Sequence, residues 1–207
     1  MMEQDMIQNC IKNLKRNGFD AHFFNDTETA KRMILEWIIH YESFGIGGSE
    51  TVRGLNIVST LKEKGKIVCD HWEKGFTKHE DLNLRLMQGR CDCFLCSANA
   101  ISASGEIVNI DGIGNRITAM SFGPKRVIIV AGTNKLTPDL ASAMKRAKEV
   151  AAPLRAKSLG LNTPCVKTGR CTDCDSPQRI CRITLLLNRC PALTPISVVL
   201  INKQLGY

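Results

Sequence analysis

Apolar and polar residues follow two different periods along this chain, and the two periods alternate. Helical spacing of three and four residues recurs in five segments, which are residues 6–16, 27–40, 52–61, 80–88 and 138–156. Short apolar runs bounded by turn residues predict strands, at residues 21–24, 43–46, 66–70, 93–97, 107–110 and 127–131. Because strands alternate with helices, we expect an α/β fold with a mostly parallel sheet flanked by helices.

The last third of the chain departs from this alternation. Residues 161–181 are rich in Cys, Asp, Pro and Gly, and two apolar runs follow at residues 183–187 and 196–201. They predict a small C-terminal cysteine-rich loop and a pair of final strands. We also expect Thr137 to cap the helix that begins at Pro138. One hydrophobic core can organise 207 residues, so we expect a single domain over residues 1–207.

Composition narrows the class of protein. Apolar residues make up 43% and charged residues 23%, as in ordinary globular chains. No apolar stretch approaches the roughly 20 residues of a membrane span, and the first residues do not resemble a secretory signal. We therefore expect a cytoplasmic protein. The net charge of +8 is spread along the chain with few aromatics, which favours an anionic small molecule or an acidic protein over nucleic acid.

A glycine-rich segment, FGIGGSET, lies where a strand should meet a helix. Glycines at such a junction let backbone N–H groups approach an anion, so we consider Gly47, Gly48, Ser49 and Thr51 candidate ligand-binding residues. The segment matches neither the P-loop nor the dinucleotide fingerprint. The alternative is a tight turn with Ser49 as a helix cap.

A second polar segment, NIDGIGNR, covers residues 109–116. Asp111 could act as a general base or hold a ligand hydroxyl, and Arg116 could bind an anion through two hydrogen bonds. Gly112 and Asn115 complete this candidate set. The alternative is an Asx-turn in which Asp111 and Asn115 cap their own backbone.

Two further polar groups follow predicted strands at their carboxyl ends, where open α/β sheets bind ligands. They are Asn134 with Lys135 after residues 127–131, and Ser97 to Asn99 after residues 93–97. Ordinary loop polarity is the alternative for both. If the protein is an enzyme, acting on a sugar phosphate or a CoA ester, Asp111 would be the base and Lys135 or Arg116 would stabilise negative charge.

The ten cysteines occur without a secretory signal, which favours thiols or metal ligands over disulfides. Cys165, Cys171, Cys174 and Cys181 have the spacing C-x5-C-x2-C-x6-C, and four thiolates are the number that zinc or an iron–sulfur cluster needs. The alternative is a loop of reduced thiols, as in a metal or thiol sensor. The cluster Cys91, Cys93 and Cys96 is typical of core packing. His71, beside Trp72, is either an acid/base group or a hydrogen-bonded structural histidine.

Several segments together resemble the lactate-utilisation (LUD) domain family of bacterial and archaeal proteins. They include GIGGSETVRGL, CDHW, NIDGIGNRITAMSFGPKRVIIVAGTNKL, LNTPCVKTGRCTDCDSPQRIC and LINKQLGY. The resemblance implies a fold of the ribose-phosphate isomerase, glucosamine-phosphate deaminase and CoA-transferase type. In those relatives a glycine loop holds phosphate, as Gly47 to Thr51 would here. An Asp-Gly loop lies opposite, matched by Asp111, Gly112 and Asn115. The isomerases' full acidic motif and the transferases' glutamate motif are absent from the sequence, so their chemistry does not carry over.

The resemblance also implies a role in oxidising lactate to pyruvate, usually as a subunit beside iron–sulfur and oxidoreductase proteins. The sequence lacks the repeated ferredoxin motifs of the larger subunit and any readable flavin or nicotinamide motif. We therefore expect an accessory subunit that binds an anionic small molecule between the two polar loops. Its expected partner is an iron–sulfur oxidoreductase subunit, and a homo-oligomer is compatible with the sequence.

Overall fold

The computed structural model describes residues 2–207, and its centre is a six-stranded parallel sheet. The strands are β1 (Asp20–Phe24), β2 (Ser43–Ile46), β3 (Ile67–Asp70), β4 (Cys93–Cys96), β7 (Arg126–Gly132) and β10 (Ile196–Ile201). Their order across the sheet is β1-β10-β7-β4-β2-β3, and every neighbouring pair is parallel. The predicted α/β class with a parallel sheet is confirmed.

A second, four-stranded sheet lies beside the first. It consists of β5 (Ala100–Ser102), β6 (Ile107–Asp111), β8 (Leu136–Thr137) and β9 (Ile183–Leu187), in the order β8-β5-β6-β9. Strand β6 runs antiparallel to both β5 and β9. The two predicted final strands are confirmed as β9 and β10, but each belongs to a different sheet.

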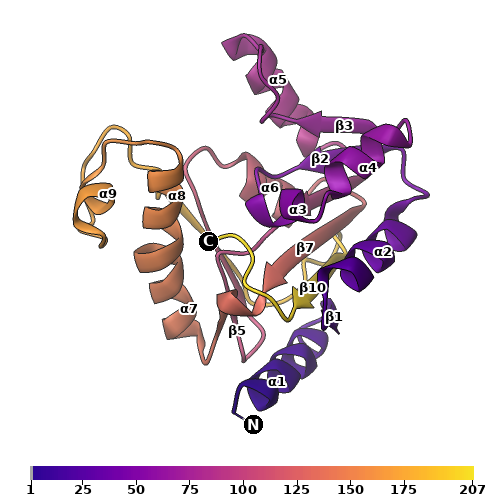
Figure 1. Ribbon diagram of the computed structural model, residues 1–207, viewed down its shortest axis with the longest axis horizontal. Helices are drawn as coiled ribbons and strands as arrows, with labels where there is room; N and C mark the ends of the chain where they lie inside the picture. The colour runs from indigo at the N-terminus through magenta and orange to yellow at the C-terminus, as the bar shows by residue number, and fades with distance from the viewer. Residues whose placement is uncertain (1) are drawn as a thin grey trace.

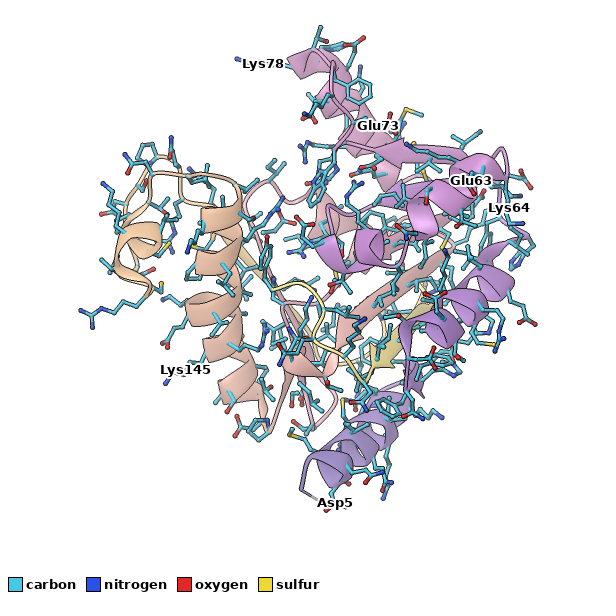
Figure 2. The ribbon with its side chains drawn as sticks, in the orientation of Figure 1. Asp5, Glu63, Lys64, Glu73, Lys78 and Lys145 are labelled. Carbon is cyan, nitrogen blue, oxygen red and sulfur yellow. The ribbon has the colours of Figure 1, made fainter. Side chains whose placement is uncertain are left out.

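Helices cover both faces of the parallel sheet. One face packs against α1 (Met2–Arg16) and α6 (Asn115–Ser121), for example through Leu14 and Met120. The other packs against α2 (Thr27–Ile38), α3 (Glu50–Gly54) and α4 (Ile57–Glu63), where Ile34 and Leu61 are fully buried. Charged side chains such as Glu63 and Lys64 stand on the outside (Figure 2).

The remaining helices lie around the site. Helix α5 (Lys78–Gln88) projects from the body (Figure 1). A short 3₁₀ turn, η1 (Thr133–Lys135), follows β7. Helix α7 (Leu140–Arg146), the π-helical segment η2 (Ala147–Ala151) and α8 (Ala152–Ser158) form one rod, and the short α9 (Pro164–Thr168) follows it. The rod packs on the second sheet through small residues, Ala143 and Ala147 against Ala100 and Val108.

Three local predictions were wrong. The helix predicted over residues 52–61 is broken into α3 and α4, because Asn56 adopts a left-handed conformation with φ 53°. Thr137 is paired in β8, and the cap of α7 is Asp139, whose side chain accepts a hydrogen bond from Ser142 N at 2.7 Å.

The third wrong prediction concerns the polar segment 109–116, which is not a continuous loop. Strand β6 continues to Asp111, and Asn115 already begins α6, so only residues 112–114 connect the two elements.

Within residues 2–207, no helix combines the length and the apolar character that crossing a membrane requires.

Candidate functional site

Adjacent parallel strands deliver their carboxyl ends to one cavity of about 430 Å³. The glycine segment 47–51 follows β2, Ser97 and Asn99 follow β4, Lys135 follows β7, and His71 follows β3. These strands are neighbours in the order β7-β4-β2-β3. After β2 the chain forms β3 on one side of it, and then returns to form β4 on the other side. The direction in which strands are added therefore changes between β2 and β4, and open α/β sheets bind ligands at such switch points.

Lys135 is the most unusual charged group in the cavity wall. Its side chain is 3% exposed, and Nζ donates hydrogen bonds to Thr51 Oγ1 at 3.0 Å and Ser97 Oγ at 2.8 Å. Among the side chains that the structure describes, no carboxylate forms an ion pair with it. Burial lowers the pKa of this amine to about 7, and the positive charges of Arg146 and Arg116 act in the same direction. The amine is therefore part protonated and part neutral near neutral pH.

Arg116 and Asp111 form a second polar centre on the opposite wall. Arg116 Nη2 donates to Ile110 O at 2.6 Å and to Asn99 Oδ1 at 3.3 Å, and its Nε lies 3.6 Å from Asp111 Oδ2. Asp111 Oδ1 accepts hydrogen bonds from the backbone N–H groups of Ile113 and Gly114. The Asx-turn is thus present for Asp111, while Asn115 uses its amide elsewhere.

The pKa of Asp111 follows from these contacts. Burial raises the pKa of the carboxyl, but the Arg116 charge and backbone N–H groups lower it by more, so it lies below its ordinary value. An ionised carboxylate with a lowered pKa and three nearby donors, the N–H groups of Ile113 and Gly114 and the Arg116 guanidinium, is a weak proton acceptor. The geometry therefore favours Asp111 as a partner that orients Arg116.

The glycines after β2 are required by close packing and by backbone conformation. A Cβ on Gly47 would lie 2.7 Å from Phe94 Cζ and 2.9 Å from Cys96 Cβ. Gly48 has φ +55°, and a Cβ there would lie about 3.1 Å from the His71 ring. Ser49 caps α3 by accepting from Val52 N at 3.2 Å. The turn-and-cap interpretation holds for this segment, and the same turn forms part of the cavity wall.

A buried amide holds the region between the two loops together. Gln88, the last residue of α5, donates from Nε2 to Ile46 O, to Cys69 O and to His71 Nδ1, at 2.8, 3.2 and 2.8 Å. Its Oε1 accepts from Asn115 Nδ2 at 3.0 Å. Burial lowers the pKa of His71 to about 4, with the charge of Arg85 acting in the same direction. His71 is therefore neutral at pH 7, with Nδ1 as an acceptor and a proton on Nε2.

Trp72 and two arginines form the outer rim. The guanidinium carbons of Arg53 and Arg155 lie 4.2 and 4.7 Å from the centre of the Trp72 ring. Arg155, from α8, also lies 3.5 Å from Glu50 Oε1. Arg155 was not predicted to be a site residue, because a cation on a helix ordinarily faces solvent.

The C-terminal segment closes another side of the cavity. Thr51 Oγ1 donates to Leu205 O at 3.3 Å, and a Cβ on Gly206 would lie 2.6 Å from Thr51 Oγ1. Asn134 binds this segment through Leu205 N at 3.0 Å and Gly206 O at 3.4 Å. The C-terminus accordingly lies near the middle of the molecule, between α8 and α3 (Figure 1).

The structure brings together all but one of the residues predicted to bind a ligand. Those that line the cavity are Gly47, Gly48, Ser49, Thr51, Asn99, Asp111, Gly112, Asn115, Arg116 and Lys135. Asn134 is the exception, because its amide holds the C-terminal segment. The predicted metal residues Cys165, Cys171, Cys174 and Cys181 lie apart, around a smaller hollow.

Other residues of the cavity wall were missed. They include Trp72, Arg85, Ala152, Arg155, Ile180, Gly206 and Tyr207. They come from helices and from segments far apart in the sequence, with no spacing that predicts a shared site, so only the folded chain brings them together.

The fold and the cavity define a class of protein, an α/β protein with a cationic cavity at the carboxyl edge of its parallel sheet. The model of the LUD domain family matches residues 7–201, and the chain belongs to that family. The resemblance read from the sequence is confirmed.

One solved structure of similar fold is a DUF162 family protein from Deinococcus radiodurans. It is 12% identical, with a TM-score of 0.57, and the match covers 97% of this chain and 99% of that one. No curated protein gives a significant match.

Proposed function

We propose that this protein is an accessory subunit of a lactate-utilisation type redox system and that its cavity binds an anionic small molecule. Membership of the LUD domain family supports the first part. The charge of the cavity supports the second. Four cationic side chains, Lys135, Arg85, Arg116 and Arg155, line the cavity, and the carboxylate side chains among its described lining residues are those of Glu50 and Asp111.

The two carboxylates leave this positive charge only partly balanced. Asp111 is near Arg116, Glu50 is near Arg155, and Arg85 is paired with Asp81, a residue outside the cavity lining. Among the described residues, Lys135 Nζ has hydroxyl groups as hydrogen-bond partners, those of Thr51 and Ser97, and no carboxylate. Burial has removed the water that would solvate the charged form of the Lys135 amine. An anion that reaches Lys135 would stabilise that charged form in place of water.

The size of the cavity bears on the kind of anion. About 430 Å³ lies within the usual range for small-molecule sites, roughly 300–1,000 Å³. This is more room than a three-carbon acid fills. We therefore expect an anion with the size of a sugar phosphate, or the phosphate-bearing part of a larger molecule, to bind more tightly than lactate.

Calorimetry with lactate, pyruvate, inorganic phosphate, ribose 5-phosphate and CoA tests the binding proposal. We expect at least one of these anions to bind wild-type protein and to bind Lys135→Met much more weakly. Lys145→Met is the matched control, because Lys145 is 73% exposed, points away from the molecule (Figure 2) and is not among the residues that line the cavity. Equal binding by wild-type protein and Lys135→Met would contradict the proposal.

The role as an accessory subunit requires a test in the cell. A tagged chain, purified anaerobically from its own host during growth on lactate, should retain an iron–sulfur oxidoreductase. A solitary chain, together with normal growth on lactate after deletion of the gene, would refute this role.

The Lys135 amine favours a second candidate, an enzyme acting on a sugar phosphate or a CoA ester. A buried amine with a pKa near 7 can accept and return a proton under physiological conditions. Asp111 is less suited, because its pKa is lowered. Turnover that survives Asp111→Asn but not Lys135→Met would assign the acid/base role to Lys135, and turnover that survives both substitutions would exclude it.

A further inference from the structure

Four cysteines in the segment between α8 and β9 surround one small hollow of about 20 Å³. They are Cys165, Cys171, Cys174 and Cys181. All four are free thiols of intermediate exposure. The five cysteines at positions 10, 69, 91, 93 and 96 are instead buried in the interior. Packing in the hydrophobic core accounts for the five buried cysteines. It does not account for the four partly exposed cysteines around the hollow.

The backbone of this segment is organised around the hollow by one arginine. Arg179 donates from Nε to Cys181 O at 2.9 Å and from Nη1 to Cys174 O at 2.8 Å. Its Nη2 donates to Asp173 Oδ1 at 2.8 Å. Asp173, within the C-x2-C pair, has a left-handed φ of 49°. Asp adopts this conformation readily, and the turn that it forms places Cys171 and Cys174 at the same hollow.

The charges around the hollow suit an anionic metal centre. Four thiolates around a zinc ion, or around a [4Fe–4S] core of charge 2+, carry a net charge of about −2. Lys148 and Arg179 both line the hollow, and both are near Asp173, at 3.5 and 2.8 Å.

The hollow adjoins the cavity of the proposed function. Ala152 and Ile180 line both spaces. Ile180 O lies 2.9 Å from the place that a Cβ on Gly112 would occupy, and Arg182 N donates to Asp111 O at 3.1 Å. These contacts attach the end of the cysteine segment to the Asp111 turn. A change in the conformation of the cysteine segment would therefore move part of the cavity wall.

We propose that Cys165, Cys171, Cys174 and Cys181 bind a thiophilic metal centre, either an iron–sulfur cluster or a zinc ion, and that its binding fixes the cavity wall formed by Ile180 and Gly112. Within residues 2–207, no three His, Cys, Asp or Glu side chains are already arranged around a single metal position. Binding therefore requires the thiols to rotate into the hollow, and four thiols lose their protons as four metal–sulfur bonds form.

Metal analysis of the full chain, purified without oxygen, tests the first part of this proposal. We expect either iron with acid-labile sulfide and a visible charge-transfer spectrum, or about one zinc ion per chain. Cys174→Ser and Cys181→Ser should each lose most of the metal. Cys190→Ser, which changes a half-buried cysteine outside the hollow, should retain it.

The outcomes separate clearly. Wild-type protein that holds neither metal after anaerobic reconstitution with iron and sulfide, or with zinc, overturns the proposal. Disulfides between these cysteines, or equal metal content in a Cys165, Cys171, Cys174 and Cys181 quadruple serine variant, also overturn it. Circular dichroism checks that each variant is folded.

Hydrogen exchange tests the coupling to the cavity. Loss of the metal should increase exchange in residues 161–182 and also in residues 111–114, because the two segments share hydrogen bonds and packing. Unchanged exchange in residues 111–114 would show that the metal stabilises only its own loop. Neither result depends on the identity of the anion in the cavity.

Discussion

At the scale of single residues, the polar groups that interrupt apolar runs were the ones that the sequence could identify. Lys135 follows β7 of the parallel sheet, whose strands bring their carboxyl ends together. Asp111 and Arg116 come at and after the end of another strand-forming run, that of β6 in the second sheet. Arg155 could not be found in this way, because its helix carries several cations and only packing shows which one faces the cavity. The position of Lys135 could be predicted from the sequence. Its lowered pKa could not, because that shift is caused by burial in the folded protein.

Replacing Lys135 with Met should stabilise the protein at low pH. The pKa of this amine falls from 10.5 to about 7 on folding, so the unfolded chain binds more protons between these values. The cost of burying the amine is therefore complete below pH 7 and disappears as the pH rises toward 10.5. We expect Lys135→Met to be about 2–4 kcal/mol more stable than wild type at pH 6.

Urea unfolding at pH 6 and pH 9 measures this effect. The gain in stability should be smaller at pH 9. A gain of the same size at both pH values would show that packing, and not charge, is responsible. Lys145→Met, an exposed change, should alter stability by less than about 0.5 kcal/mol.

Replacing Asp111 with Asn separates its two interactions. The amide oxygen can still accept the hydrogen bonds of Ile113 and Gly114, whereas the ionic attraction to Arg116 is lost. We expect a loss of about 1–2 kcal/mol of stability at pH 7. The lowered pKa of Asp111 means that this contribution is present above the ordinary pKa of 3.8 and is lost as the pH falls through the folded-state value.

The same substitution should make phosphate bind more tightly, by a few-fold, because the cavity loses a negative charge. Calorimetry with inorganic phosphate measures it, and Asp5→Asn, at an exposed position of α1 (Figure 2), is the control. Weaker phosphate binding would indicate that Asp111 orients Arg116 more than it repels the anion.

At the scale of elements, strands were predicted better than helix ends. The runs that form β2, β9 and β10 are short and rich in apolar residues, and their bounds agree with the prediction. Helix interruptions depend on tertiary structure. Pro153 lacks an N–H group and follows the π-helical segment η2, whose wider turn accommodates the missing hydrogen bond. Helical periodicity alone does not reveal such a change.

Helix α5 matters to the site through its last residue, and Gln88→Ala should show this. The substitution leaves buried acceptors on Ile46 and Cys69 without their donor, so we expect a loss of about 2–4 kcal/mol. His71 also loses the partner of Nδ1, and its pKa should move from about 4 toward its ordinary value. Chemical denaturation and histidine NMR titration measure these effects. Asn83→Ala, at an exposed position of the same helix, should leave both quantities nearly unchanged.

At the scale of the whole molecule, the class of fold followed from the sequence but the order of strands did not. Alternating periods predict a parallel sheet, yet nothing local indicates that β10 lies between β1 and β7. The same long-range closure places residues 205–206 against Thr51. Asn134 illustrates the consequence, because its position after β7 predicted a ligand contact and the structure gives it the C-terminal segment as a partner.

Asn134→Ala should release this segment. It removes hydrogen bonds to Leu205 N and Gly206 O, so amide exchange in residues 203–207 should become faster while exchange in β10 stays slow. Association of the anion with the cavity should become faster because one wall is loosened. If exchange in residues 203–207 is unchanged, the contact between Thr51 and Leu205 is sufficient to hold them.

The central place of β10 also shapes how the molecule folds. Strand β1 pairs with residues that follow it by about 177 positions, Asp20 with Ser197 for example, and β7 gains its second neighbour from the same late strand. During synthesis, the edges of β1 and β7 that pair with β10 stay unpaired until residues 196–201 have been made. Such long-range pairing slows folding and exposes strand edges to other nascent chains. A chaperone that shields these edges should therefore raise the yield of folded protein.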